Sequence, residues 1–212
     1  MSIFSKPAVQ NFVQQAHKRS YAPKHTLMLA GDPPQSIYLI LEGSVSILLE
    51  DENGREIVLA YLNPGDFFGE LCLFQDQLAR TAIVRTRTPT LAAELNYEAF
   101  MKFYRENPDI MFEIAGQLAS RLRETTRRLF DLAFLDVAGR MARTLIDLTK
   151  KRESVANPRG TIIRTSRQEL ARLVGCSREM SGRVLKKLEE DGIVLTQGRS
   201  ILVVGVSKPV AA

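Results

Sequence analysis

The chain has 212 residues, of which 45% are hydrophobic and 25% charged, a balance typical of one large or two small globular domains. No window approaches the ~18 consecutive apolar residues of a membrane span. The start, MSIFSKPAVQ, has no basic cluster followed by an apolar core, so no secretory signal is visible. These features predict a cytoplasmic protein without a membrane partner. Two cysteines and two histidines are too few to predict a metal centre.

The charge is distributed unevenly along the chain. Residues 1–106 carry 10 Lys+Arg and 12 Asp+Glu, a net charge of −2, whereas residues 107–212 carry 19 and 12, a net charge of +7. A basic C-terminal half predicts a nucleic-acid partner for that half only.

Residues 25–95 contain short runs rich in β-branched, leucine and aromatic residues, separated by turn signals. Asn53-Gly54 is one such signal, and Asn-Gly between two strands favours a hairpin because both residues accept a positive φ. Strands at this spacing predict an antiparallel barrel or roll. The predicted strands are 37–41, 44–49, 56–62, 81–86 and 90–95.

The hydrophobic period changes after Asn107, where Pro108 is suited to the first position of a helix. From there, apolar residues recur at alternating steps of four and three, which is the seam of a coiled coil held for about three heptads. The helix could pack on its own roll or pair with a second copy, and we favour pairing because nothing else in the chain is placed to cover so long a seam. The seam residues are Met111, Ala115, Leu118, Leu122, Leu129 and Leu132.

One position in this seam is polar. Thr125, with Thr126 beside it, interrupts the apolar repeat. A polar residue in a seam costs stability and can set the register, or it can face a polar group that arrives from elsewhere.

The C-terminal part predicts a DNA-binding motif. After an amphipathic helix over 137–152, a loop over 156–160 and a strand over 161–165, residues 166–192 form two helices joined by a bend at Gly175. Ser166 and Ser177 are the predicted N-caps, and Ser166 has Glu169 three residues later, the spacing of a capping box. Residues 193–205 then form a hairpin, so that the whole reads as a winged helix-turn-helix.

The second helix of the motif is predicted to present its first turns to DNA. Arg178, Glu179 and Arg183 lie outward as base-reading residues, because arginine pairs with guanine and glutamate accepts from cytosine. Met180, Val184, Leu185 and Leu188 lie inward. Phosphate contacts, which position the protein without specifying sequence, are assigned to Arg167, Gln168 and Lys186, with Ser177 at the start of the reading helix.

The chain resembles the cyclic-AMP receptor protein (catabolite activator protein) family of bacterial transcription regulators. The likeness runs from about Tyr21 to Gly205 and is strongest in GDFFGELCLF, NPDIMFEIAGQLASRL, DLAFLDVAGRMARTL and TSRQELARLVGCSREMSGRVLKKLEEDG. It implies an α+β fold: an N-terminal antiparallel β-roll that binds a cyclic nucleotide (1–106), a dimerisation helix and hinge (107–134), and a C-terminal winged helix-turn-helix (135–212).

The resemblance also implies a ligand site in the stretch GELCLFQDQLART, residues 69–81, which looks like a phosphate-binding cassette. Arg80 would give the cyclic phosphate a forked, charge-assisted donor pair, and Thr81 would add its hydroxyl and backbone N–H. Glu70 suits the ribose 2′-hydroxyl, and Gly69 lets the backbone approach the sugar.

By the same resemblance, Thr125 of one subunit and Thr126 of the other would hydrogen-bond the adenine of cyclic AMP, so the ligand would bridge a homodimer. The hinge would lie around residues 134–136, and the operator would be a palindrome of TGTGA-like half-sites, with RNA polymerase as a further partner. The chain departs from the family pattern in three places. Cys72 replaces a common glycine, and Ser181 replaces an apolar residue, which predicts looser packing of its helix. ANPRG (156–160) lacks the threonine and histidine that precede the proline in the best-known relative.

The sequence leaves two alternatives. An enzyme acting on cyclic nucleotides would need clustered metal ligands, and His17 and His25 are the only histidines, so we expect no catalytic activity. A regulator gated by cyclic-di-GMP is the alternative within the same architecture. Relatives of that kind lack the small-Arg-Ser/Thr triplet, which is present here as Ala79-Arg80-Thr81 and favours cyclic AMP.

Overall fold

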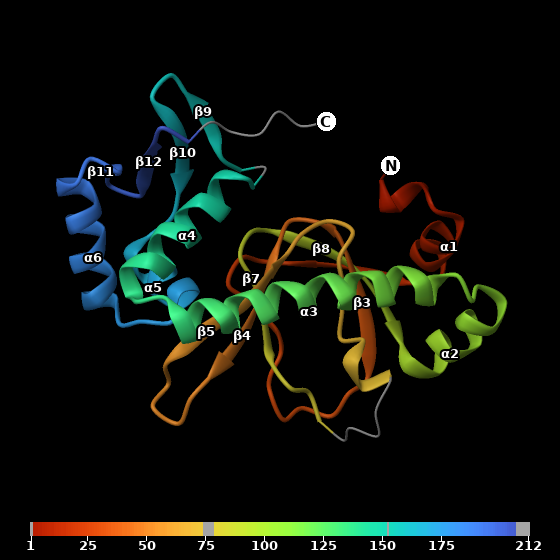
Figure 1. Ribbon diagram of the computed structural model, residues 1–212. Helices are drawn as coiled ribbons and strands as arrows, with labels where there is room; N and C mark the ends of the chain where they lie inside the picture. The colour runs from red at the N-terminus through yellow and green to blue at the C-terminus, as the bar shows by residue number, and fades with distance from the viewer. Residues whose placement is uncertain (1, 74–78, 152, 207–212) are drawn as a thin grey trace. The chain divides into compact units, whose positions relative to one another are not determined.

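The protein is described by a computed structural model that covers residues 2–73, 79–151 and 153–206. It forms two compact units, one up to Thr125 and one from Thr126 onward. The boundary between them falls inside the long green helix of Figure 1, α3 (Ile110–Phe134). No helix in the described part of the chain is long and apolar enough to cross a bilayer.

The first unit is built on two four-stranded antiparallel sheets, which confirms the predicted roll. All five predicted strands are present, each within two residues of its expected bounds. The first sheet has the spatial order β1 (His17–Tyr21), β8 (Thr90–Asn96), β3 (Ser36–Glu42) and β6 (Phe67–Phe68). The second sheet has the order β2 (Thr26–Met28), β7 (Ile83–Thr86), β4 (Val45–Glu50) and β5 (Glu56–Leu62).

Strand β3 is buried on both faces, because successive side chains of a strand point to opposite sides. Ile37 and Leu39 pack under the helices, whereas Ile40 belongs to the core between the two sheets. Phe67 and Phe68 of β6 divide in the same way. Residues 37–41 are therefore apolar without alternation, because each face of the strand packs into a different core.

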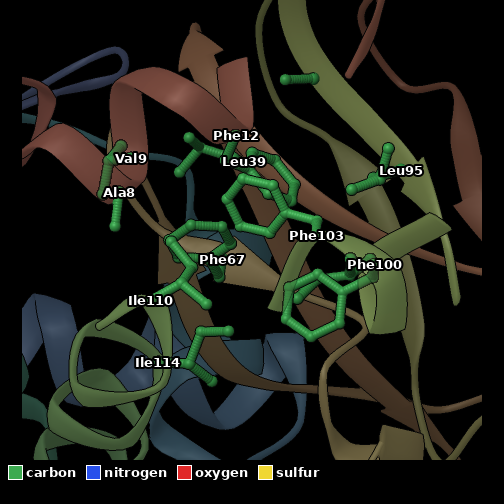
Figure 2. Packing of buried hydrophobic residues seen from close by; sticks show 12 residues of the cluster. Ala8, Val9, Phe12, Leu39, Phe67, Leu95, Phe100, Phe103, Ile110 and Ile114 are labelled. Atoms are coloured by element: carbon green, nitrogen blue, oxygen red, sulfur yellow. The ribbon is translucent and has the colours of Figure 1, made fainter. Parts of the chain in front are cut away.

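Three helices cover the outer face of the first sheet, and Figure 2 shows their packing. They are α1 (Pro7–Gln15), α2 (Tyr97–Glu106) and the first turns of α3, with short 3-10 turns at Ile3–Ser5 and Leu71–Leu73. The ring of Phe12, on α1, meets that of Phe67 edge to face, with ring centroids 5.2 Å apart, and that of Phe103, on α2, at 5.8 Å. Ile110 and Ile114 of α3 close the cluster, which anchors the start of that helix on the roll.

Helix α3 begins at Ile110, two residues later than predicted, because α2 ends at Glu106 and residues 108–109 form a turn between the two helices. Gln117, on the next turns of α3, donates to Gly65 O at 2.8 Å and accepts from Phe67 N at 2.8 Å. This amide therefore fastens the middle of α3 to the backbone around β6.

The second unit, the blue-green elements of Figure 1, is a winged helix-turn-helix as predicted. Ser166 and Ser177 accept hydrogen bonds from the N–H groups of Glu169 and Met180 at 3.1 Å, which confirms both N-caps. Gly175 has a φ of +70°, as the bend requires. The elements are α4 (Val137–Thr149), β9 (Val155–Asn157), β10 (Gly160–Arg164), α5 (Arg167–Val174), α6 (Arg178–Glu190), β11 (Val194–Gln197) and β12 (Ser200–Val204).

The prediction of a loop over 156–160 was partly wrong. Residues 155–157 form strand β9, which pairs with β10 and completes a sheet of order β11-β12-β10-β9. The backbone hydrogen bonds of the pairing outweigh the weak strand propensity of Ala-Asn. Met141 and Leu145 of α4 pack in one core with Leu170, Leu185 and the sheet.

Candidate functional site

Gly69, which follows β6, adopts a backbone conformation that strongly favours glycine. Its φ is +82°, and a Cβ atom there would lie 2.9 Å from the Ser36 carbonyl oxygen and 3.0 Å from Arg80 Nη1. The carbonyl oxygen of Gly69 accepts a hydrogen bond from that same Nη1 at 3.0 Å. Gly69 and Arg80, two of the expected site residues, are therefore in direct contact although they are 11 positions apart in sequence.

The guanidinium of Arg80 is buried, with 8% of the residue exposed, and three acceptors orient it. Besides Gly69, Nη1 donates to the Tyr97 hydroxyl at 2.8 Å and Nη2 to Ser36 O at 2.7 Å. The Tyr97 hydroxyl itself donates to the Gly69 carbonyl oxygen. A guanidinium has five N–H donors. In the described part of the chain, Nε and one hydrogen of Nη2 have no partner, which leaves a forked donor pair for an anion.

Glu70 is paired with an arginine that the sequence had not singled out. Its carboxylate lies 2.8 Å from Arg121 Nη1, and only 4% of the residue is exposed. Arg121 also donates to Phe67 O and, at 3.2 Å, to Gln117 Oε1. Burial raises the pKa of Glu70 above its ordinary value, although the positive charges of Arg121 and Arg80 oppose that rise.

Two positive groups against one carboxylate give this cluster a net charge of +1 when all three are ionised. Arg80, Arg121 and Glu70 therefore suit a ligand that carries a single negative charge and a hydroxyl donor. A cyclic phosphodiester on a ribose has both features.

Thr81, Thr125 and Thr126 are exposed, and their contacts with a ligand stay predictions. Thr81 directly follows Arg80 in the chain. Thr125 lies one helical turn beyond Arg121, and residues four apart lie on the same face of a helix. That spacing is the one signal in the sequence that points to Arg121.

Cys72 lies half-buried at the edge of the same cluster. Its thiol is 3.8 Å from the Ala79 carbonyl oxygen and also contacts the Tyr97 hydroxyl. Burial raises the pKa of Tyr97 to about 12, with the nearby Arg80 opposing and the Cys72 thiol adding to the rise. The tyrosine thus stays protonated and keeps its hydroxyl available for hydrogen bonding.

The second candidate surface is on α6. Arg178, Glu179, Arg183 and Lys186 are all exposed, as are Arg167 and Gln168 at the start of α5. Glu179 and Arg183 form an ion pair at 2.8 Å, four residues apart on the helix. The predicted outward face of the reading helix is therefore present, while base contacts stay a prediction.

Three hydrogen bonds hold α6 against its neighbours. Ser181 is fully buried, and its hydroxyl donates to Arg167 O at 3.1 Å, so this departure from an apolar residue adds a link to α5. Glu189 accepts from Thr196 N at 2.7 Å and from its hydroxyl at 2.9 Å, which ties the wing to the end of α6.

Comparison with known proteins matches both units. Residues 18–107 match the cyclic nucleotide-binding domain, and residues 139–208 match the Crp-like helix-turn-helix domain. The chain is 45% identical to the cAMP-activated global transcriptional regulator Vfr of Pseudomonas aeruginosa, over 93% of this chain and 94% of that one. It is 42% identical to the cAMP-activated global transcriptional regulator CRP of Pasteurella multocida, over 94% and 95% of the two chains.

A solved structure gives the same picture. The c-di-GMP responsive global regulator CLP of Xanthomonas campestris is 44% identical and superimposes with a TM-score of 0.90, over 94% of this chain and 99% of that one. Matches to both domains and near full-length identity to these regulators show that the chain belongs to the CRP/FNR family of DNA-binding transcription regulators, and not to a family of enzymes.

Proposed function

We propose that this protein is a homodimeric transcription regulator whose DNA binding is controlled by cyclic AMP. The observation that carries the proposal is the buried guanidinium of Arg80, which three acceptors hold and whose remaining N–H donors have no partner among the described residues. The pair of Glu70 and Arg121 beside it would meet the ribose hydroxyl. Residues 1–106 would hold the ligand, 107–134 would dimerise and 135–212 would bind DNA.

The exposed part of α3 supports the proposed dimer. Leu122 is 68% exposed and Leu129 66%, whereas Leu118 packs partly on the roll. Large apolar side chains at heptad spacing on an exposed helix suit pairing with the same helix of a second copy. The dimer would bring Thr126 of one copy toward the ligand of the other.

The DNA would be a palindrome of TGTGA-like half-sites about one helical turn apart, because a two-fold dimer presents two α6 helices at fixed spacing. Arg178, Glu179 and Arg183 would read bases. Contacts with RNA polymerase would follow from its role as a regulator of transcription.

Cyclic-di-GMP is the second candidate effector, favoured by the 44% identity to a c-di-GMP responsive regulator. Two features support cyclic AMP instead. The triplet Ala79-Arg80-Thr81 is present, and its arginine is already buried and oriented.

Calorimetry tests the choice directly, with cyclic AMP and cyclic-di-GMP titrated separately into the purified protein. We expect cyclic AMP to bind to the wild-type protein. Arg80→Leu should lose on the order of 2–4 kcal/mol of binding free energy, or ~30–1,000-fold in affinity, because the charge-assisted contact is lost and the phosphate is desolvated without a charged partner. Wild-type affinity in the variant would contradict the cassette assignment. Binding of cyclic-di-GMP alone would favour the second candidate.

A further inference from the structure

Two ion pairs join the end of α3 to α4. Arg127 Nη2 lies 2.6 Å from Asp147 Oδ2, and Arg143 Nη1 pairs with Asp131 Oδ1. Arg127 and Asp131 are four residues apart on α3, and Arg143 and Asp147 are four apart on α4. Each helix therefore offers one cation and one anion on a single face, and each charge meets its opposite. All four residues lie in the second unit.

The surroundings make this pairing more than a surface contact. Asp131 is only 7% exposed, so loss of Arg143 would leave a buried carboxylate without its cation. Burial alone would raise the pKa of Asp147, but the hydrogen bonds and charges of Arg127 and Lys150 hold it below its ordinary value. In each ion pair the side chain of the aspartate is less exposed than that of the arginine.

The corner between the helices is fastened as well. Arg140 Nη1 donates to Leu135 O at 2.9 Å, and Asp136 caps α4 by accepting from Gly139 N at 2.8 Å. Arg140 Nε also donates to Val174 O, at the end of α5, at 3.2 Å. A continuous set of contacts thus runs from the end of α3 through α4 to the helix-turn-helix.

We propose that Arg127, Asp131, Arg143 and Asp147 form an ionic clasp that sets the direction of α4, and with it α6, for binding DNA. The clasp makes residues 127–134 of α3 part of the DNA-binding body. These four are positioning residues: they do not touch DNA. The part that the clasp plays in DNA binding rests on the proposed function.

Charge reversal with a compensating swap tests the clasp in the full-length protein. Arg127→Asp or Asp147→Arg alone places like charges together, and the double variant restores an opposite pair in reversed order. These two side chains are partly exposed, so the variants should fold. The readouts are hydrogen exchange of residues 127–134 and affinity for a duplex with two inverted TGTGA half-sites. Glu98→Lys, which breaks the exposed pair of Glu98 and Lys102 in the first unit, is the matched control.

We expect each single reversal to speed exchange in residues 127–134 by about tenfold and to weaken DNA binding by a similar factor, with recovery in the double variant. The control should change neither. Unchanged exchange in the single variants, or a double variant no better than the singles, would overturn the clasp. If cyclic AMP does not change the DNA affinity of the wild-type protein, the proposed effector is wrong. The hydrogen-exchange result then decides whether the clasp exists.

Discussion

At the scale of single residues, the proposed ligand site depends on the direction of one guanidinium. Arg80 reaches the site because Gly69, Ser36 and Tyr97 take up three of its donors. The first two contribute backbone carbonyl oxygens, so Tyr97 is the side chain through which the orientation of Arg80 can be changed. Sequence alone predicted Arg80 but not Tyr97, because the two residues meet only through the fold.

Tyr97→Phe keeps the ring and removes the hydroxyl that accepts from Arg80. We expect affinity for cyclic AMP to fall by about five- to tenfold, or about 1–1.4 kcal/mol, because the guanidinium loses one of three orienting contacts. Tyr38→Phe is the control, since that hydroxyl donates to Glu94 at 2.9 Å instead. Calorimetry in which the two variants lose equal affinity would show that Tyr97 acts only through stability.

The residues on α6 should separate into two classes. Glu179→Ala should relax preference at one base pair, worth roughly 1–3 kcal/mol of discrimination, whereas Lys186→Ala should weaken all sequences alike and lower the salt slope by about one unit. Binding to a panel of single-base operator variants at two salt concentrations distinguishes them. Equal losses on every operator for Glu179→Ala would contradict its base-reading role.

At the scale of elements, α3 carries two different apolar faces. Ile110 and Ile114 are buried on the roll, while Leu122 and Leu129 are exposed at positions of the predicted seam. The heptad pattern predicts a dimer seam, which stays a prediction, and it did not show where the helix leaves its own roll. Leu118, expected in the seam, also packs on the core of the first unit.

Leu122→Glu combined with Leu129→Glu should yield monomers without specific DNA binding, because carboxylates would face each other across the seam. Arg123→Glu, an exposed residue of α3 outside the seam, should remain dimeric. Sedimentation velocity measures both. A stable dimer in the double variant would mean that the subunits associate through another surface.

Elements with a strong pattern were predictable, and elements without one were not. Strand 56–62 was found at its observed bounds because turns enclose a β-branched run. Strand β1, HKRSY, is exposed at four of its five residues and lies at the edge of its sheet, so it has no hydrophobic alternation. The partner of Glu70 was missed because Arg121 lies 51 residues away in sequence. Local periodicity does not contain such contacts.

At the scale of the whole molecule, charge and sites are divided between the two halves. The half with a net charge of −2 contains most of the proposed ligand site, and the half with +7 contains the helix-turn-helix. If ligand binding raises operator affinity by some factor, operator binding must raise ligand affinity by the same factor. Arg80, in the first half, should therefore control DNA binding that it does not touch.

The most direct measurement is fluorescence anisotropy of a duplex with two inverted TGTGA half-sites, titrated with protein at fixed salt, with and without saturating cyclic AMP. We predict that cyclic AMP raises operator affinity by roughly 5–150-fold, the usual range of allosteric coupling, and that Arg80→Leu loses this response while keeping its ligand-free affinity. Equal operator affinity with and without cyclic AMP, or a response to cyclic-di-GMP alone, would contradict the account.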